Sequence, residues 1–269
     1  MKLIQGKIAV VTGASEGIGR AISLSLAKEG AILILLARGQ EKLNLLKDEI
    51  VSLGQRAYTF PCDMANPEEV KKTFSQILNQ FQRVDILVNN AGIGTFKPLH
   101  LIDYDELLRP VQLPIASSIL ATRLVIEGML NRKEGHIVNL TSPAGYFPIP
   151  YMIPYTTARF AMVGFSNSLA EEMNGKGIHV SLICPAQVNT SYFQKNDANM
   201  DWYPKISKLM PILEAEEVGK KVVQAIYQKK KEVIFPFILW AIVRTYQTLP
   251  NLGLGLFKLL GLFKPTAKL

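Results

Sequence analysis

The chain has 269 residues, of which 48% are hydrophobic and 19% are charged, with 19 glycines and 15 prolines. This length and composition suit one large α/β domain and argue against a disordered chain or a disulfide scaffold. The formal net charge of +8 comes entirely from residues 220–269, which hold nine basic side chains and one acidic one, whereas residues 1–219 hold 21 of each sign. A neutral body removes the argument for nucleic-acid binding.

Neither the start of the chain nor its cysteines point to export. Residues 1–6 do not lead from positive charge into a long apolar segment, so no secretory signal is predicted. Cys62 and Cys184 fit no metal or redox spacing and are interpreted as buried thiols in a reducing compartment. The longest apolar run, residues 233–243, is shorter than the about 20 residues that span a bilayer. We expect a cytoplasmic protein with no transmembrane helix and no metal site.

Short aliphatic runs alternate with longer amphipathic segments along residues 1–235. Strands are predicted at residues 7–11, 32–37, 57–61, 86–88, 136–140, 179–183 and 232–235, and helices at residues 17–29, 40–53, 67–82, 104–130, 155–173 and 214–228. This alternation predicts right-handed βαβ units, and strands this apolar are expected to be buried on both faces. The predicted fold class is α/β, with a doubly wound parallel sheet in a single domain, residues 1–235, and a C-terminal amphipathic tail, residues 236–269.

A glycine-rich turn joins the first strand to the first helix, from Thr12 to Gly19. Glycines at this spacing allow a tight turn, and they let a pyrophosphate approach backbone N–H groups at a helix N-terminus, where the dipole favours anions. The candidate cofactor-binding residues of this turn are Gly13, Ser15, Glu16, Gly17, Ile18 and Gly19. The alternative is a turn with a purely structural role.

The end of the second strand bears on the choice of cofactor. A free ribose 2′-OH is usually held by an acidic residue there, whereas a 2′-phosphate needs that acid to be absent and an arginine nearby. The strand ends Leu36-Ala37-Arg38-Gly39, and the guanidinium of Arg38 suits phosphate. NADP(H) is therefore favoured over NAD. The alternative is that Arg38 is a solvated residue at a helix start.

Further motifs follow in order, and with them the chain resembles a classical short-chain dehydrogenase/reductase over about residues 5–235. These motifs are Asp63 after the third strand, Asn89-Asn90-Ala91-Gly92 after the fourth, Ser142 after the fifth, Tyr155 thirteen residues later, and Pro185 to Thr190 after the sixth. The resemblance implies a Rossmann-type fold and hydride transfer between a nicotinamide and a carbonyl or alcohol carbon. It also implies that Asp63 and Met64 contact the adenine, and that Val188 and Thr190 hold the carboxamide. Asn90, Ala91, Gly92 and Pro185 are further cofactor candidates.

The same resemblance assigns the chemistry to Ser142 and Tyr155. Negative charge develops on the carbonyl oxygen as hydride arrives, so a hydroxyl that gives a proton there lowers the barrier. Tyr155 is the candidate acid, and Ser142 would orient the same oxygen. The family's lysine, four residues later, is here Arg159, which keeps the charge but carries protons poorly. Three alternatives remain: an active reductase with altered proton handling, a binding protein with weak or no turnover, and coincidental structural residues.

Two more positions depart from the family's pattern. Gln112 falls at or near a position that usually holds an asparagine, and it lies between Pro110 and Pro114, which are expected to disturb the helix. Pro185-Ala186 replaces the usual Pro-Gly, which suggests that this backbone does not need a positive φ. Gln112 is therefore a fourth catalytic candidate beside Ser142, Tyr155 and Arg159.

The variable loop and the tail carry the expectations about substrate and partners. Residues 191–211 contain Tyr192, Phe193, Trp202, Tyr203, Leu209 and Met210, which suit either a lipophilic substrate or ordinary packing of a flap. The basic tail, which contains Trp240, is predicted either to lie on a membrane surface or to pack over the pocket or a partner subunit.

Together these features predict an NADPH-dependent oxidoreductase for a lipophilic ketone or secondary alcohol, such as a 3-oxoacyl, sphingoid or steroid-like compound. The alternative function is a non-catalytic NADP(H)-binding scaffold of the same fold. The expected partners are the lipophilic small molecule and a membrane surface, with no nucleic acid. The resemblance alone adds a homo-oligomer, either a dimer or a tetramer.

Overall fold

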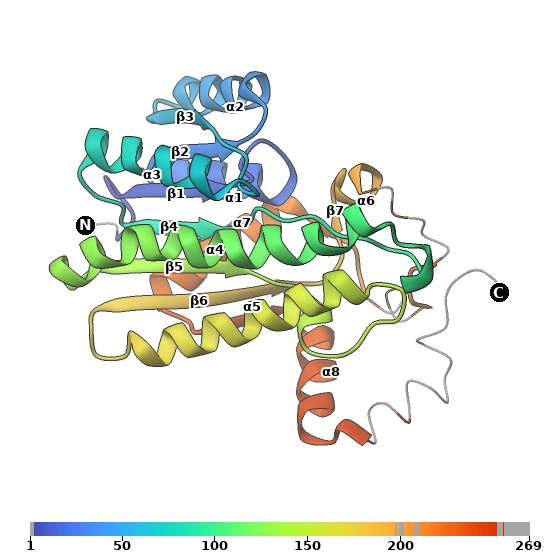
Figure 1. Ribbon diagram of the computed structural model, residues 1–269. Coiled ribbons are helices and arrows are strands. Elements are labelled where there is room, and N and C mark those ends of the chain that lie inside the picture. Colours follow the sequence, from blue (N-terminus) through green and yellow to red (C-terminus); the bar gives the residue numbers. More distant parts are fainter. Residues whose placement is uncertain are drawn as a thin grey trace.

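A computed structural model describes residues 3–196, 198, 202–205, 207, 210–251 and 255, except for the side chain of residue 105. Seven parallel strands form one sheet in the order β3-β2-β1-β4-β5-β6-β9 (Figure 1). They are β1 (Ile8–Thr12), β2 (Ile32–Ala37), β3 (Ala57–Pro61), β4 (Ile86–Asn89), β5 (Gly135–Leu140), β6 (Ile178–Pro185) and β9 (Glu232–Phe235). The order reverses between β1 and β4, and such a switch point is where an open parallel sheet binds its ligands.

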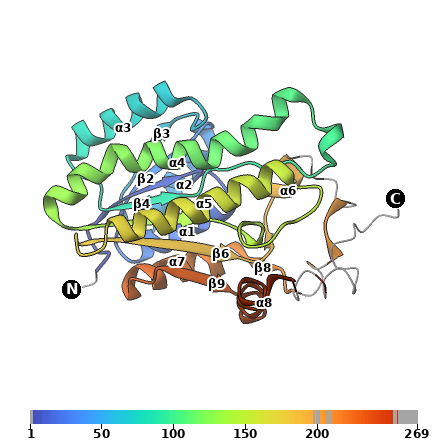
Figure 2. The ribbon, with the colours of Figure 1, turned by 60° about the horizontal axis from the view of Figure 1, so that its bottom comes forward.

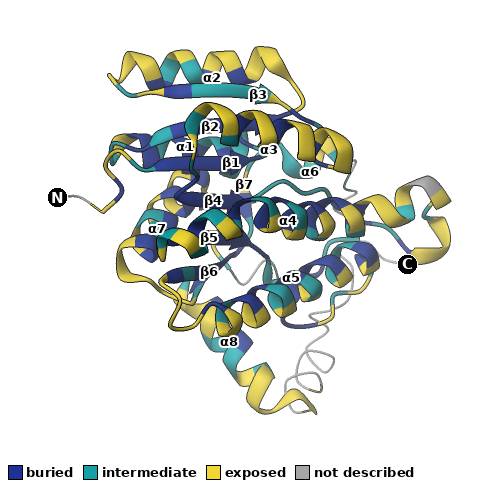
Figure 3. Ribbon diagram, turned by 60° about the vertical axis from the view of Figure 1, so that its left-hand side comes forward, coloured by how far each residue is buried: buried dark blue, intermediate teal, exposed yellow. Residues whose placement is uncertain are grey.

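Helices cover both faces of the sheet. They are α1 (Gly17–Lys28), α2 (Gln40–Ser52), α3 (Pro67–Phe81), α4 (Tyr104–Arg132), α5 (Ile153–Glu172) and α7 (Ala215–Gln228). Successive strand residues point to opposite faces, so Ala9 and Val11 pack with α1, α2 and α7, whereas Ile8 and Val10 pack with α3, α4 and α5. The result is a three-layer sandwich in which the central strands are almost wholly buried, whereas the edge strands β3 and β9 are partly buried (Figure 3).

The predicted fold class is confirmed: a Rossmann-type α/β fold with a parallel sheet. The strands and helices of the sheet region lie where the sequence predicts them, with ends that differ by at most two residues. The sequence did not predict the small sheet of β7 (Val188–Asn189) and β8 (Leu213–Glu214), nor the short helix α6 (Tyr192–Lys195). Pairing of β7 with β8 ties together the two ends of the variable loop.

Helix α4 corrects one expectation, because it runs without interruption through Pro110 and Pro114. Its packing against α3, α5 and the sheet compensates for the backbone hydrogen bonds that the prolines cannot make. Among the described helices, α4 is the one long and apolar enough to cross a membrane, but 44% of its most apolar window is buried in the protein. That burial is typical of a helix that belongs to a packed domain.

The start of the C-terminal tail forms helix α8 (Phe237–Thr248), which follows β9 directly and projects beyond the sheet (Figures 1 and 2). Its inner face buries Leu239 and Val243 in the hydrophobic core. Its outer face leaves Phe237 77% and Trp240 41% exposed. Residues 252–254 and 256–269, which complete the tail, lie outside the described residues.

Candidate active site

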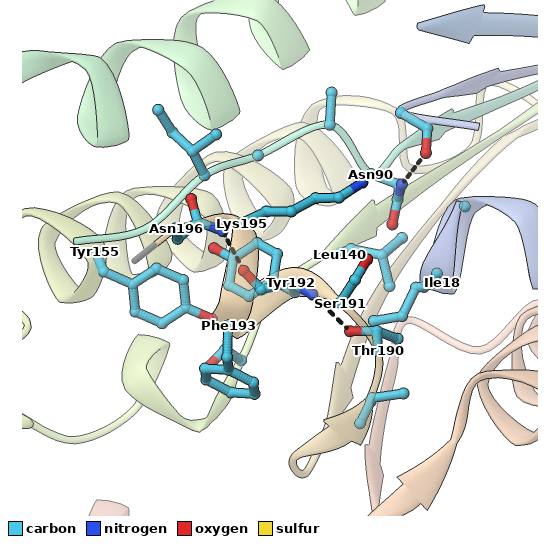
Figure 4. Close-up of a pocket in the computed structure, with 18 of the residues that line it drawn as sticks. Ile18, Asn90, Leu140, Tyr155, Thr190, Ser191, Tyr192, Phe193, Lys195 and Asn196 are labelled. Carbon is cyan, nitrogen blue, oxygen red and sulfur yellow. Dashed lines mark hydrogen bonds between the residues drawn. The ribbon is translucent and has the colours of Figure 1, made fainter. Parts of the chain in front are cut away.

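A cavity of about 500 Å³ opens at the carboxyl ends of the central strands, a volume that suits a small-molecule site. It brings together all but one of the sequence-predicted site residues, from loops at the carboxyl ends of the strands and from α5. Figure 4 shows part of the lining, including Ile18, Asn90, Tyr155 and Thr190. The predicted residues that line it are Gly13, Ser15, Glu16, Gly17, Ile18, Gly19, Arg38, Asp63, Met64, Asn90, Ala91, Gly92, Ser142, Tyr155, Arg159, Pro185, Val188 and Thr190.

The structure does not bring Gln112 to this cavity. Gln112 is exposed on α4, and the next residue, Leu113, is buried and lines the cavity instead. One residue turns a helix by about 100°, so an alignment that is correct to within one position still selects the wrong face. Leu113 carries no polar atom on its side chain, so it cannot replace the side-chain amide of the asparagine that the family usually has at this position.

The glycine-rich turn has the close backbone packing that its sequence suggests. A Cβ atom on Gly19 would lie 2.1 Å from the Gly13 carbonyl oxygen, and Gly13 itself has a φ of +64°. The Asn90 amide fixes the turn by donating to the Thr12 and Gly13 carbonyl oxygens, at 2.9 and 3.2 Å. No side chain caps the N-terminus of α1 at Gly17, so its first N–H groups are available to an anion at the cavity. The turn therefore fits a dinucleotide pyrophosphate.

Two cations, Arg38 and Lys42, line the cavity near the glycine-rich turn. Arg38 is exposed at the end of β2, and Lys42 lies one helical turn further along the chain. Asp63 follows β3, where its side chain accepts a hydrogen bond from the Ala65 N–H at 3.0 Å. Lys42 was missed in the sequence, although its position four residues after Arg38 on a helix start is a signal that could have found it.

The proposed acid and its neighbours come from β5 and α5. Ser142 follows β5 and accepts a hydrogen bond from the Ala144 N–H at 3.2 Å, which leaves its own O–H free to donate. Tyr155 lies in the first turn of α5, and Arg159 lies one turn later on the same face. Both Ser142 and Tyr155 are partly exposed to the cavity, whereas Arg159 is only 7% exposed.

Arg159 is held as a buried cation beneath the tyrosine. Its Nη1 donates to the Leu140 carbonyl oxygen at 3.1 Å, and its Cζ lies 4.7 Å from the centroid of the Tyr155 ring. Burial opposes the charge, but the phenol oxygens of Tyr155 and Tyr192 outweigh burial and raise the pKa of Arg159. Its Nε is buried with no hydrogen-bond partner among the described residues, so a donor remains for a ligand hydroxyl.

An aromatic wall closes the substrate side of the cavity. The rings that line the cavity are those of Tyr155, Tyr192, Phe193 and Tyr203. Phe96 is buried outside the lining and contacts all four, with ring centroids 5.4 to 6.3 Å apart. Phe96 was missed because nothing in its sequence context distinguishes it from an ordinary core residue.

The other residues predicted from the variable loop, residues 191–211, do not all line the cavity. Met210 lines the cavity, whereas Trp202 packs on Tyr151 with centroids 5.1 Å apart and does not line it. Leu209 lies outside the described residues.

Ala186 is not among the described residues with positive φ, in keeping with the loss of the usual glycine. In the described part of the chain, no group of three or more His, Cys, Asp or Glu side chains is placed to hold a metal ion.

The strand order, the glycine turn and the cavity define a Rossmann-type dinucleotide-binding protein. A family model described as short chain dehydrogenase matches residues 7–201. The chain belongs to this family of oxidoreductases, which bind nicotinamide cofactors.

Relatives and solved structures agree with this assignment. The chain is 33% identical over 255 residues to human 17-beta-hydroxysteroid dehydrogenase 13, covering 93% of this chain and 81% of the relative. A metagenomic short-chain oxidoreductase in complex with NADP is 30% identical with a TM-score of 0.72, covering 86% of this chain and 96% of the other. A short chain dehydrogenase/reductase from Burkholderia phymatum in complex with NAD is 25% identical with a TM-score of 0.83, covering 94% and 96%.

Proposed function

We propose that this protein is an NADPH-dependent reductase of lipophilic ketones, which also oxidises the corresponding secondary alcohols. The observation that carries the proposal is the placement of Ser142, Tyr155 and the buried Arg159 at one cavity, beside an aromatic wall. When bound, the nicotinamide supplies the hydride that reduces the carbonyl carbon. Side chains of this chain orient the ketone and protonate its oxygen.

Tyr155 gives its phenolic proton to the carbonyl oxygen, on which negative charge develops. The Arg159 guanidinium, 4.7 Å from the Tyr155 ring, stabilises the phenolate left behind. Ser142 donates its free O–H to the same substrate oxygen and so orients the ketone. Arg159 does not release its own proton, because its pKa is raised, so the proton that restores Tyr155 comes from solvent.

Arg38 and Lys42 support NADPH as the preferred cofactor. The relatives of known structure include one with NADP and one with NAD, so these side chains decide the preference. Two cations at the end of β2 suit a 2′-phosphate through charge-assisted hydrogen bonds. We expect NADPH to bind about tenfold more tightly than NADH, and Arg38→Gln to remove most of this difference. Tighter binding of NADH by the wild type would refute the assignment.

The aromatic wall supports a rigid, lipophilic ketone as the substrate class. Three aromatic rings, those of Tyr192, Phe193 and Tyr203, line the cavity together with Tyr155. A flat apolar substrate gains contact area there without displacing hydrogen-bonded groups. The name of the human relative, a hydroxysteroid dehydrogenase, supports the same class.

The outer face of α8 supports attachment to a membrane surface. Phe237 and Trp240 stack there with centroids 5.5 Å apart, and Ile238 and Leu249 are also exposed, at 44% and 53%. In the sequence, α8 is followed by a nearly uncharged apolar segment, residues 252–263, and then by Lys264 and Lys268. Aromatic side chains beside basic residues are typical of a helix that lies in a membrane interface.

A non-catalytic NADP(H)-binding scaffold remains the second candidate, because Arg159 stands in the family's lysine position and is a poor proton carrier. A spectrophotometric assay of NADPH oxidation with alkyl, bicyclic and steroid ketones distinguishes a reductase from a non-catalytic scaffold. We expect turnover by the wild type, and loss of at least about a hundredfold in Tyr155→Phe with unchanged NADPH binding. Equal rates for the two proteins on every ketone would favour the scaffold.

A further inference from the structure

Tyr192, on α6, places a buried hydroxyl in the cavity wall with no hydrogen-bond partner among the described residues. Figure 4 shows this side chain between Tyr155 and Leu140. Buried hydroxyl groups in folded proteins nearly always have a partner, because leaving one without a partner destabilises the protein. The Tyr192 hydroxyl is an exception, and it lies beside Tyr155, the proposed acid.

The backbone around Tyr192 is held in place on both sides. The Tyr192 carbonyl oxygen accepts a hydrogen bond from the Asn196 amide at 2.6 Å, and Asn196 in turn accepts one from the Gly94 N–H at 3.0 Å. Gly94 also allows the hydroxyl to lie where it does, because a Cβ atom there would be 2.9 Å from the Tyr192 oxygen. Asn196 and Gly94 therefore fix the position of the Tyr192 hydroxyl.

The ring of Tyr192 is fixed by edge contacts with Phe96 and Phe193, whose centroids lie 6.3 and 5.8 Å away. Its centroid is 6.5 Å from that of Tyr155, and the charge of Arg159 acts on both phenols. Burial raises the pKa of Tyr192 despite this charge, so the phenol keeps its proton and can donate it in a hydrogen bond.

We propose that Tyr192 is a substrate-positioning residue, whose hydroxyl donates a hydrogen bond to an oxygen atom of the bound ketone next to Tyr155. This proposal rests on the proposed reductase function. A carbonyl oxygen has room for two donors, and the negative charge that develops on it during reduction attracts a third. The guanidinium of the neighbouring Arg159 can only donate, so the Tyr192 O–H has no acceptor among the described residues. A fixed O–H of this kind is suited to that role, since bound substrate supplies the missing acceptor.

Tyr192→Phe tests the proposal, because it removes the hydroxyl and keeps the ring. Without ligand, we expect its melting temperature to rise by about 2–4 °C, since a buried donor without a partner is lost. We expect kcat/KM for tetralone, a bicyclic ketone, to fall by about tenfold or more, and Kd for NADPH to stay within about twofold of the wild-type value. Tyr58→Phe is the matched control, since Tyr58 lies on β3 against Phe81, and it should change none of these quantities.

A lower melting temperature with unchanged kcat/KM would overturn the proposal, because the hydroxyl would then have a structural role. A weaker Kd for NADPH at unchanged tetralone kinetics would also overturn it, since the hydroxyl would then serve the cofactor. If the wild type reduces none of the alkyl, bicyclic and steroid ketones, the proposed function fails, and a second measurement still decides the role of Tyr192. That measurement is the rise in melting temperature caused by tetralone in NADP-loaded protein, which Tyr192→Phe should reduce and Tyr58→Phe should keep.

Discussion

A buried guanidinium beneath Tyr155, the proposed acid, is the most unusual residue of the site. Arg159 is 7% exposed, donates to the Leu140 carbonyl oxygen and stacks over Tyr155. In the proposed mechanism it supplies the electrostatic part of the family lysine's role, while its raised pKa prevents the proton-carrying part. We therefore propose that charge and proton transfer, which one lysine combines, are separated in this chain.

Arg159→Lys should preserve or raise the turnover of a ketone substrate, because an ammonium group keeps the charge and also exchanges protons readily. The variant should melt a few degrees lower, because it loses the stacked guanidinium and its fork of donors. Steady-state kinetics and thermal unfolding measure the two effects. Arg159→Met is the control for charge and should lose most activity. A large loss in Arg159→Lys would contradict this separation of roles.

His136 is a buried histidine outside the site that makes stability depend on pH. It lies on β5, where its Nε2 is 2.8 Å from the Ser181 hydroxyl, which itself donates to the Lys230 carbonyl oxygen at 2.5 Å. Burial lowers the pKa of His136 from 6.5 to about 3. Below pH 6.5 the unfolded chain therefore binds a proton that the folded protein excludes, and stability falls as the pH drops towards 3.

The free energy of unfolding should decrease by about 1.4 kcal/mol per pH unit through His136 between pH 6 and pH 4. His136→Gln keeps an N–H donor without a titrating group, so its stability should depend less steeply on pH across this range. Urea unfolding at several pH values measures both slopes. His100→Gln, at an exposed position, should match the wild-type slope. Equal slopes for wild type and His136→Gln would show that His136 does not cause the acid sensitivity.

An ion pair links helix α6 to the glycine-rich turn at the cavity. Lys195 forms an ion pair with Glu16 of the glycine turn, and Glu16 also pairs with Lys42 at 2.9 Å. Burial favours the neutral acid, but the hydrogen bonds and charges of Lys195 and Lys42 prevail and lower the pKa of Glu16. At neutral pH this carboxylate therefore bridges α6 and α2 across the site.

Lys195→Gln should release α6 and speed the dissociation of NADPH. The ion pair is partly exposed, so its loss should raise the dissociation rate by no more than about fivefold. Stopped-flow displacement of NADPH measures this rate. Lys28→Gln, at the end of α1 and outside the cavity lining, should leave it unchanged. A dissociation rate in Lys195→Gln equal to that of wild type would mean that opening of α6 does not limit cofactor release.

The elements of the sheet could be predicted from sequence, whereas the contacts of α6 could not. Strands such as Ile32–Ala37 are continuous apolar runs, and helices such as Pro67–Phe81 begin with a recognisable cap, so local pattern suffices for both. Leu113 and Lys195 reach the cavity, and Phe96 contacts the rings that line it, through tertiary packing of segments far apart in sequence. Their partners are not encoded in any local period, and for Leu113 an error of one residue was enough to select Gln112.

The molecule as a whole separates an electrically balanced body from a basic, apolar C-terminus. Residues 1–219 carry equal numbers of acidic and basic side chains, and the excess charge follows in residues 220–269. Helix α8, which belongs to the basic part, packs Leu239 and Val243 into the core of the body and leaves Phe237 and Trp240 exposed. The two sequence-based alternatives for the tail, packing and surface attachment, are therefore compatible on opposite faces of one helix.

Replacing Phe237 and Trp240 together by serine should weaken binding to vesicles of phosphatidylcholine and phosphatidylserine by about tenfold or more, because both side chains are exposed on the face proposed to enter the interface. Melting temperature should change little, since the inner face of α8 is kept. Sedimentation with vesicles measures the binding. Leu45→Ser, at a position 65% exposed on α2, serves as the control. Undiminished binding by the double variant would rule out this face of α8.

The contact between Tyr246 of α8 and Phe147, with centroids 6.0 Å apart, links this helix to the cavity, because Phe147 lines it. Since all seven strands are parallel, β9 ends at the same edge of the sheet at which the cavity opens. A membrane-bound α8 would hold the cavity mouth near the lipid. Turnover would then follow the mole fraction of ketone within the bilayer, and diluting the ketone with inert lipid at constant bulk concentration would slow the reaction.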